Sequence, residues 1–151
     1  MVQTRIIALG NRLRGDDAAG LLAADRLANT PIPAGAEVIE GPEDPVRLLD
    51  LLDGVDRIVI LDAADMGLEP GSIRVLRDEA DWANVRRHQS VHAVGIQDLV
   101  AMARKFGITS QVTLVAIQAA SWKMGEGLSP AVMDALDRFK EIALKEASNE
   151  V

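Results

Sequence analysis

The chain has 151 residues, of which 48% are hydrophobic and 26% are charged, and it carries a net charge of −7 and no cysteine. This length and composition are typical of a single globular domain spanning residues 1–151. The acidic balance argues against nucleic acid or an anionic membrane as the main partner, since both attract clustered Lys and Arg. The absence of cysteine excludes disulfides, thiolate zinc sites and cysteine nucleophiles. Because no segment resembles a membrane span or a secretory signal, we expect a cytoplasmic location without membrane insertion.

In chain order, the pattern predicts a buried strand over 4–9, a helix over 17–28 and a second strand over 36–41. Asp44 and Pro45 predict the N-cap and first position of a helix that stops before Gly54. The later elements are expected to be a doubly apolar strand over 57–62, a strand over 71–76, a helix over 93–107, a strand over 111–117 and a helix over 129–147.

This alternation of strands and helices predicts an α/β protein with three layers, α/β/α. A mostly parallel, twisted five-stranded sheet is expected to carry helices on both faces. In such folds the ligand site lies beyond the carboxyl ends of the strands. Asp16 and Asp17 follow the first predicted strand, and Asp62 ends the third. We therefore expect the chemistry at this edge of the sheet.

The segment "LGNRLRGDDAAG" places two acidic residues, Asp16 and Asp17, side by side at the start of a predicted helix. Two like charges repel, so the pair is unfavourable unless a cation approaches it. The helix N-terminus stabilises an ionised carboxylate through its dipole. A structural alternative is that Asp16 is the N-cap of that helix, which would explain one aspartate but not both.

A charged residue at the end of a wholly apolar strand is uncommon unless it is paired or binds a ligand, which makes Asp62 a candidate. The alternative is a loop-capping aspartate, the role we expect for Asp65 in the turn before Gly67. The chain has two histidines, and His92 is expected at a helix N-terminus. The dipole there favours a neutral imidazole that can bind a cation. We interpret His88 as a solvated surface residue.

Asp17, Asp62 and His92 together would offer two oxygen ligands and one nitrogen ligand. A divalent transition metal such as nickel or zinc accepts that set with positions left open. The zinc-protease motif H-E-x-x-H, the G-x-S-x-G nucleophile elbow and the Walker loop are all absent from the sequence.

Four blocks of the chain together resemble the hydrogenase maturation proteases, endopeptidases that trim the C-terminal extension from the large subunit of [NiFe] hydrogenases. The blocks are "LGNRLRGDDAAG", "RIVILDAADMGLEPGSIRVL", "SVHAVGIQDLV" and "VAIQAASWKMGEGLSPAV". "DMG" followed by "PG" is similar to the branch that acts on the hydrogenase 3 large subunit of formate hydrogenlyase. One departure is "EGPEDP" at 40–45, where many members carry a D-G-G-T-x-G-like loop that is expected to shape substrate choice.

The resemblance places the metal contacts on Asp17, Asp62 and His92. It implies that nickel arrives with the [NiFe] hydrogenase large-subunit precursor, so no tightly bound metal of the enzyme's own is expected. We hypothesise that the metal or a carboxylate-bound water activates attack on the peptide carbonyl. Asp16 is a candidate general base, and Asn11 with the backbone around Gly10 is a candidate oxyanion support.

The main alternative is a receiver-like phosphoacceptor domain, which would bind magnesium and accept a phosphoryl group on Asp62; another is a different metal-dependent hydrolase. A receiver needs its acidic pair close to the strand and a lysine after the last strand, but here Gln118 follows that strand. Trp122 could contact the precursor or pack over the sheet edge, and Trp82 is expected in the core. The segments 74–79 and 145–150 are expected to be solvated faces.

Overall fold

The computed structural model describes residues 2–77 and 91–148, and of residues 91–94 it describes the backbone alone. The strands within these ranges are β1 (Thr4–Ala8), β2 (Ala36–Glu40), β3 (Arg57–Ala64), β4 (Ile73–Leu76) and β5 (Gln111–Gln118). The helices are the short 3-10 helix η1 (Gly15–Ala18), α1 (Ala19–Leu27), α2 (Pro45–Leu51), α3 (Val91–Lys105) and α4 (Pro130–Ser148). Each predicted strand and helix is present, with differences confined to the ends.

Two of these ends differ in ways that matter for the site. The helix predicted over 17–28 begins instead as the 3-10 helix η1, in which the Ala19 amide donates to the carbonyl of Asp16, three residues before it. The Asp16 amide itself donates to Ser121 O at 2.9 Å, outside the helix. The strand predicted to end at Asp62 continues for two residues to Ala64, because β5 pairs with β3 along its full length. Asp62 therefore lies inside a strand rather than at its end.

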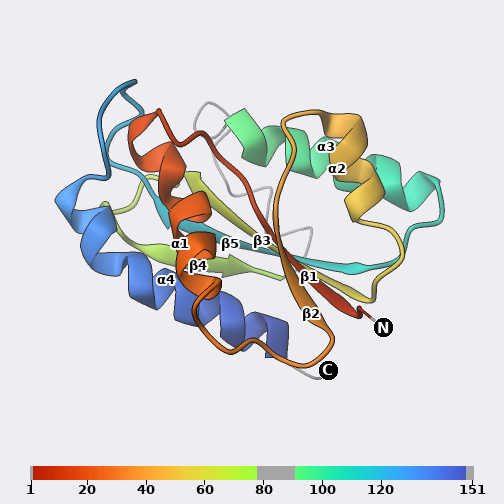
Figure 1. Ribbon diagram of the computed structural model, residues 1–151. Coiled ribbons are helices and arrows are strands. Elements are labelled where there is room, and N and C mark those ends of the chain that lie inside the picture. Colours follow the sequence, from red (N-terminus) through yellow and green to blue (C-terminus); the bar gives the residue numbers. More distant parts are fainter. Residues whose placement is uncertain (1, 78–90, 149–151) are drawn as a thin grey trace.

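The sheet has the strand order β2-β1-β3-β5-β4. β1 pairs in parallel with β2 and β3, and β3 pairs in parallel with β5, whereas β4 lies antiparallel to β5 at one edge. Figure 1 shows α1 and α4 on one face of the sheet and α2 and α3 on the other. The predicted three-layer α/β/α fold with a mostly parallel sheet is confirmed.

The core has two halves because strand side chains alternate between the faces of the sheet. Ile6 and Leu61 pack toward α1 and α4, together with Phe139 of α4. Ile7 and Ile60 pack toward α2 and α3. All five side chains are at most 1% exposed, so both faces of the central strands are buried, as their continuous apolar sequence predicts.

The start of α2 is also confirmed, since the Asp44 carboxylate accepts a hydrogen bond from the Val46 amide at 2.9 Å and Pro45 is the first helical residue. The expectation of a solvated face over 145–150 is wrong for Glu146, whereas Arg77, in the segment 74–79, is exposed as expected. Arg77 donates to both carboxylate oxygens of Glu146, at 2.7 and 2.9 Å, and Glu146 is buried. This ion pair connects the end of α4 to the residue after β4, and Glu146 raises the pKa of Arg77.

Within the described residues, no helix has the length and apolar character needed to cross a membrane.

Candidate functional site

The order of the strands creates a crevice at the carboxyl ends of β1 and β3. These two strands are neighbours at the centre of the sheet. The helix α1, which follows β1, covers one face, whereas α3, the next described helix after β3, covers the other (Figure 1). In open α/β sheets a ligand site forms where the chain separates in this way.

Asp17 lies in η1 at this crevice, and 4% of its surface is exposed. It lines a pocket of about 380 Å³, together with Gly10, Asn11 and Arg14. Its backbone is held within the loop, because its amide donates to Arg14 O at 3.0 Å and its carbonyl accepts from the Asn11 amide at 3.3 Å. Gly10 has a φ of 143°, and a Cβ at this position would overlap the Asp17 carbonyl oxygen, so the loop can pack this closely only around glycine.

Asp62 lies in β3 directly beyond the end of β1, whose last residue, Ala8, pairs with Leu61. Its register partner on β5 is Ala116, which belongs to the core half that faces α2 and α3. The pocket lined by Asp17 lies on that same side, against Leu48 of α2 and residues of α3. Asp62 is only 1% exposed, so it is enclosed at this end of the sheet.

α1 holds η1 directly against β1 and β3. A Cβ on Gly20 would lie 2.7 Å from Leu61 O and 2.8 Å from Leu9 O, closer than side-chain carbons approach carbonyl oxygens. The glycine therefore permits the start of α1 to contact the backbone of β3 and of Leu9, the residue that follows β1. This close approach places Asp17 and Asp62 on adjacent elements at the same edge of the sheet.

The backbone of His92 lies in the first turn of α3, as the sequence predicts for a helix N-terminus. It lies one helical turn before Gly95 and Ile96, which line the pocket. The His92 side chain lies outside the described residues, as do His88 and Trp82. Among the side chains that are described, no three His, Cys, Asp or Glu residues form a group that could hold a metal ion. The shared metal site of Asp17, Asp62 and His92 thus stays a prediction.

Asp16 has surroundings quite unlike those of its neighbour. Its side chain is fully buried and accepts four hydrogen bonds from the β5–α4 connection: Ala120 N at 2.8 Å, Ser121 N at 3.2 Å, Ser129 N at 2.7 Å and Ser129 Oγ at 2.9 Å. The alternative that Asp16 caps its own helix is wrong, because neither η1 nor α1 has a side-chain cap. Its predicted role as general base stays a prediction that these contacts do not favour.

The sequence interpretation missed Arg14 as a residue of the site. Arg14 lines the pocket next to Asp17, and its Nε donates to Trp122 O at 3.2 Å. The sequence does carry one signal for this role, since Arg14 is a cationic residue two positions before the acidic pair. Trp122 is partly buried and packs against the core half under α1 and α4, as the packing alternative expects, and its contact with the precursor stays a prediction.

Gln118 has a structural role in the site region that the sequence did not predict. It is buried, and its Oε1 accepts hydrogen bonds from the amides of Met66 at 2.6 Å and Leu68 at 3.3 Å. Its Nε2 donates to Asp65 Oδ1 at 3.1 Å, and the same oxygen accepts from the Gly67 amide at 3.0 Å. The turn role predicted for Asp65 is thereby confirmed, and Gln118 fixes the chain that leaves β3.

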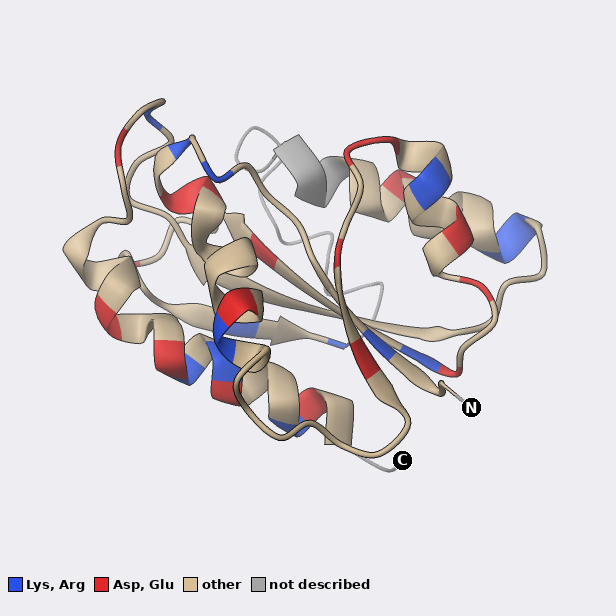
Figure 2. Cartoon of the chain, in the orientation of Figure 1, with Lys and Arg blue, Asp and Glu red and all other residues tan. Residues whose placement is uncertain are grey.

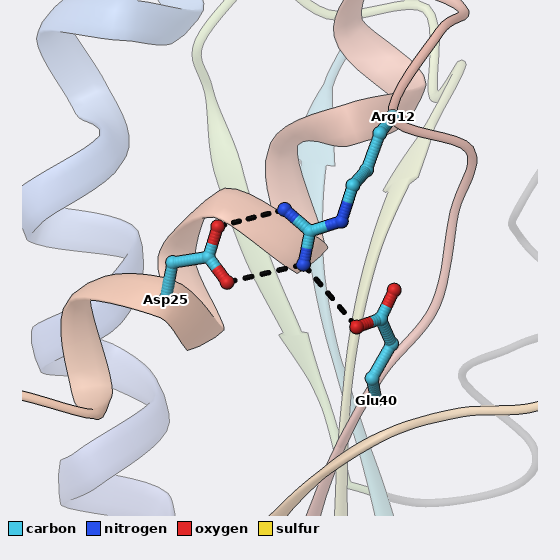
Figure 3. A network of polar contacts seen from close by, with 3 residues as sticks. All are labelled: Arg12, Asp25 and Glu40. Carbon is cyan, nitrogen blue, oxygen red and sulfur yellow. Dashed lines mark hydrogen bonds and ion pairs between the residues drawn. The ribbon is translucent and has the colours of Figure 1, made fainter.

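An ion-pair network holds the outer side of the loop between β1 and η1 (Figure 3). Arg12 donates to both oxygens of Asp25, at 2.7 and 3.1 Å, and to Glu40 at 3.2 Å, so it links the loop to α1 and to the end of β2. The hydrogen bond from Arg12 lowers the pKa of Asp25 below its ordinary value. All three side chains are exposed, so the network contributes little to global stability but restricts the loop.

Acidic residues gather at this end of the sheet. Figure 2 shows them on the turn before α1 and in the connection from β2 to α2, both at the carboxyl ends of strands. The pocket wall includes Glu43 from that connection. The connection contains "EGPEDP" at 40–45, the segment that differs from the D-G-G-T-x-G-like loop noted in the sequence analysis.

The family model for "Hydrogenase maturation protease", HycI, matches residues 23–146. The chain belongs to this family. The hydrogenase expression/formation protein HupD of Rhodobacter capsulatus is 30% identical over 150 residues, which cover 97% of this chain and 70% of HupD. Membership makes the protein a peptidase and decides against the receiver-like alternative.

Solved structures of family members have the same fold. The maturating endopeptidase HybD of Escherichia coli matches with a TM-score of 0.83 and 26% identity, over 97% of this chain and 94% of HybD. The [NiFe] hydrogenase maturation protease HybD of Thermococcus kodakarensis matches with a TM-score of 0.78 and 31% identity, over 97% and 100%. The narrower likeness to the hydrogenase 3 branch stays a prediction, since the family model carries the name HycI and these structures the name HybD.

Proposed function

We propose that this hydrogenase maturation endopeptidase removes the C-terminal extension of a [NiFe] hydrogenase large-subunit precursor after nickel has been inserted. The observation that carries the proposal is the position of two buried acidic residues, Asp17 and Asp62, on adjacent elements at the central crevice and on the same side of the sheet. The family supplies the reaction, and the names of its [NiFe] members supply the class of substrate.

In this proposal nickel belongs to the substrate, and Asp17, Asp62 and His92 recognise it. Both carboxylates are buried on adjacent elements, and a divalent cation that binds them offsets the hydration lost by burying negative charge. The enzyme thus binds a nickel-loaded precursor more tightly than an empty one, which couples cleavage to completed metal insertion. Recognition of this kind needs no metal of the enzyme's own.

The residues around the acids would then hold the scissile peptide. The pocket joins polar groups on the β1–η1 loop to an apolar wall from α2 and α3, so it can exclude bulk water from one side of a bound chain. Asn11 and the backbone at Gly10 lie at the polar side, where the sequence places a candidate oxyanion support. A water held at the Asp17 carboxylate is the candidate nucleophile.

The test compares wild-type enzyme with the variants Asp17→Asn, Asp62→Asn and His92→Ala on nickel-loaded and nickel-free large-subunit precursors. Cleavage is measured as the change in C-terminal mass. We expect each variant to lose at least about 100-fold in rate on the loaded precursor, the scale of a lost catalytic group. Wild-type enzyme should leave the nickel-free precursor uncut.

The control is Asp134→Asn, an exposed acid on α4, which covers the other face of the sheet, and this variant should process the precursor at the wild-type rate. Circular dichroism and thermal unfolding establish that each variant is folded. Full activity in all three site variants, or equal cleavage of the nickel-free precursor by wild-type enzyme, would contradict the proposal.

A further inference from the structure

The helix α3 contains a glycine at the pocket, and its own structure does not require one there. Gly95 lies well inside the helix, is exposed and does not have a positive φ. No described atom lies within 4 Å of the position that a Cβ on Gly95 would occupy. Glycine inside a helix is unfavourable relative to alanine because it orders more backbone on folding. Gly95 therefore lowers the stability of α3, although neither a turn nor close packing against a described part of the chain requires a glycine there.

The space beside Gly95 belongs to the pocket. Gly95 and Leu99, four residues apart, lie on one face of α3 and both line it. A side chain at position 95 would enter a volume of about 380 Å³, which is enough for a short peptide segment and far too small for a folded domain. The missing side chain thus keeps open a passage between α3 and the loop that carries Asp17.

The chemistry of the lining indicates what occupies this passage. The wall opposite the polar loop is formed by Leu48 and Ile96, both buried, and by Pro42 and Pro45. Proline has no amide hydrogen, so this wall offers few hydrogen-bond donors and suits an aliphatic side chain. The polar loop on the other side offers an arginine and an asparagine, which suit the carbonyl groups of a main chain.

We propose that the substrate main chain crosses α3 at Gly95 and places one aliphatic side chain between α2 and α3, next to the bond that is cut. The inference rests on the proposed function, because the chain that crosses the helix is the tail of the nickel-loaded precursor. Gly95 is then a specificity-determining residue: it admits the substrate because it has no side chain.

The experiment adds side chains at this position. Gly95→Ala should raise Tm by about 2–4 °C, because alanine favours the helix, and Gly95→Leu should leave the protein folded. On the nickel-loaded precursor, Gly95→Leu should lower kcat/KM by about 100-fold, the effect of a small displacement of the substrate, mainly through a higher KM. The matched control is Ala101→Leu, which adds a leucine to an exposed position of α3 that is absent from the pocket lining and should keep the wild-type kcat/KM.

A second measurement does not depend on cleavage. The chain lacks cysteine, so Glu43→Cys at the pocket rim can carry a single benzophenone label before the precursor is added. Irradiation should crosslink the label to the precursor tail, and Gly95→Leu in the same chain should abolish that crosslink. A label on Ala101→Cys should capture no tail.

The outcomes separate the two proposals. If wild-type enzyme cuts the precursor and Gly95→Leu cuts it equally fast, the inference about Gly95 is wrong and the proposed function stands. A lower Tm for Gly95→Ala would show that Gly95 makes room for the protein's own chain, which also overturns the inference. If wild-type enzyme cuts no precursor, the proposed function is wrong, and the crosslink at position 43 still decides whether the passage holds the tail.

Discussion

Two identical neighbours, Asp16 and Asp17, have different surroundings and therefore different roles. Asp16 is enclosed by donors from residues 120–129, whereas Asp17 lines the pocket. The sequence predicts that the pair lies at the edge of the sheet, since it follows a buried strand. The division of roles was not predictable, because the donors to Asp16 lie more than a hundred residues away along the chain. The same holds for Arg14, whose place in the pocket depends on the fold.

The contacts of Asp16 predict a loss of stability rather than a loss of chemistry when it is changed. In Asp16→Asn an amide group replaces one acceptor oxygen and faces buried donors. We expect the free energy of unfolding to fall by about 2 kcal/mol, since hydrogen bonds to charged groups each contribute about 1.5–3 kcal/mol. Urea denaturation measures this change, and Asp134→Asn, at an exposed position of α4, serves as its control.

Activity well below the unfolding midpoint distinguishes this role from general-base catalysis. A folded Asp16→Asn protein should cleave the precursor at a rate within about tenfold of wild type. Loss of a general base would lower the rate by about 100-fold or more, and we do not expect Asp16 to be that base. An unchanged unfolding free energy combined with abolished cleavage would instead make Asp16 a catalytic residue.

At the scale of elements, the position of α1 decides where the acidic pair lies. Periodicity and turn residues predicted every strand and every α-helix of the described chain, though not the 3-10 helix η1. They could do so because the local sequence shows which residues form the apolar face that packs against the sheet. The ends were less predictable. β3 is two residues longer than expected, since its pairing with Ile117 and Gln118 of β5 extends it, and no local pattern reports a partner strand.

The contact between Gly20 and the strand carbonyls predicts a sensitive position. In Gly20→Ala the new methyl group would meet Leu61 O at 2.7 Å, so α1 must move away from the sheet and carry η1 with it. We expect the free energy of unfolding to fall by about 1–3 kcal/mol, as for other overpacked positions, and processing of the precursor to slow. Thermal unfolding and cleavage assays measure the two effects.

Gly127→Ala is the matched control, since a Cβ there meets no described atom within 4 Å and its φ is not positive. It should leave both quantities near their wild-type values. If Gly20→Ala proves as stable and as active as Gly127→Ala, the close packing of α1 does not position the site.

At the scale of the whole molecule, the parallel sheet and the location of the site at its carboxyl edge were predictable from the alternation of elements. The strand order was not, because many orders satisfy the same alternation. The order β2-β1-β3-β5-β4 is what brings the segment after β1 next to Asp62. Both acids of the predicted metal set are thereby placed at one crevice, although their shared use of an ion stays a prediction.

The proposal that nickel comes with the substrate makes a prediction about the purified enzyme. Prepared without chelator, the protein should contain well below one equivalent of any transition metal by elemental analysis. Wild-type enzyme incubated with a chelator and then desalted should cut a nickel-loaded precursor at its original rate, since no metal of its own was removed. Stoichiometric zinc whose removal abolishes cleavage would indicate a self-sufficient metalloprotease instead.

Because side chains alternate between the two faces of the sheet along β3, the number of residues before Asp62 decides which face its carboxylate is on. Deleting one residue between Val59 and Asp62 would turn the carboxylate into the core half beneath α1 and α4, where Leu61 now packs. Deleting two residues would return the carboxylate to its present side of the sheet. It would then occupy the position of Ile60, which pairs with Ile7 of β1, and so lie inside the sheet instead of beyond the end of β1. A length change near β3 is therefore compatible with a working site only when it lies before the strand and leaves the register of β3 with β1 unchanged.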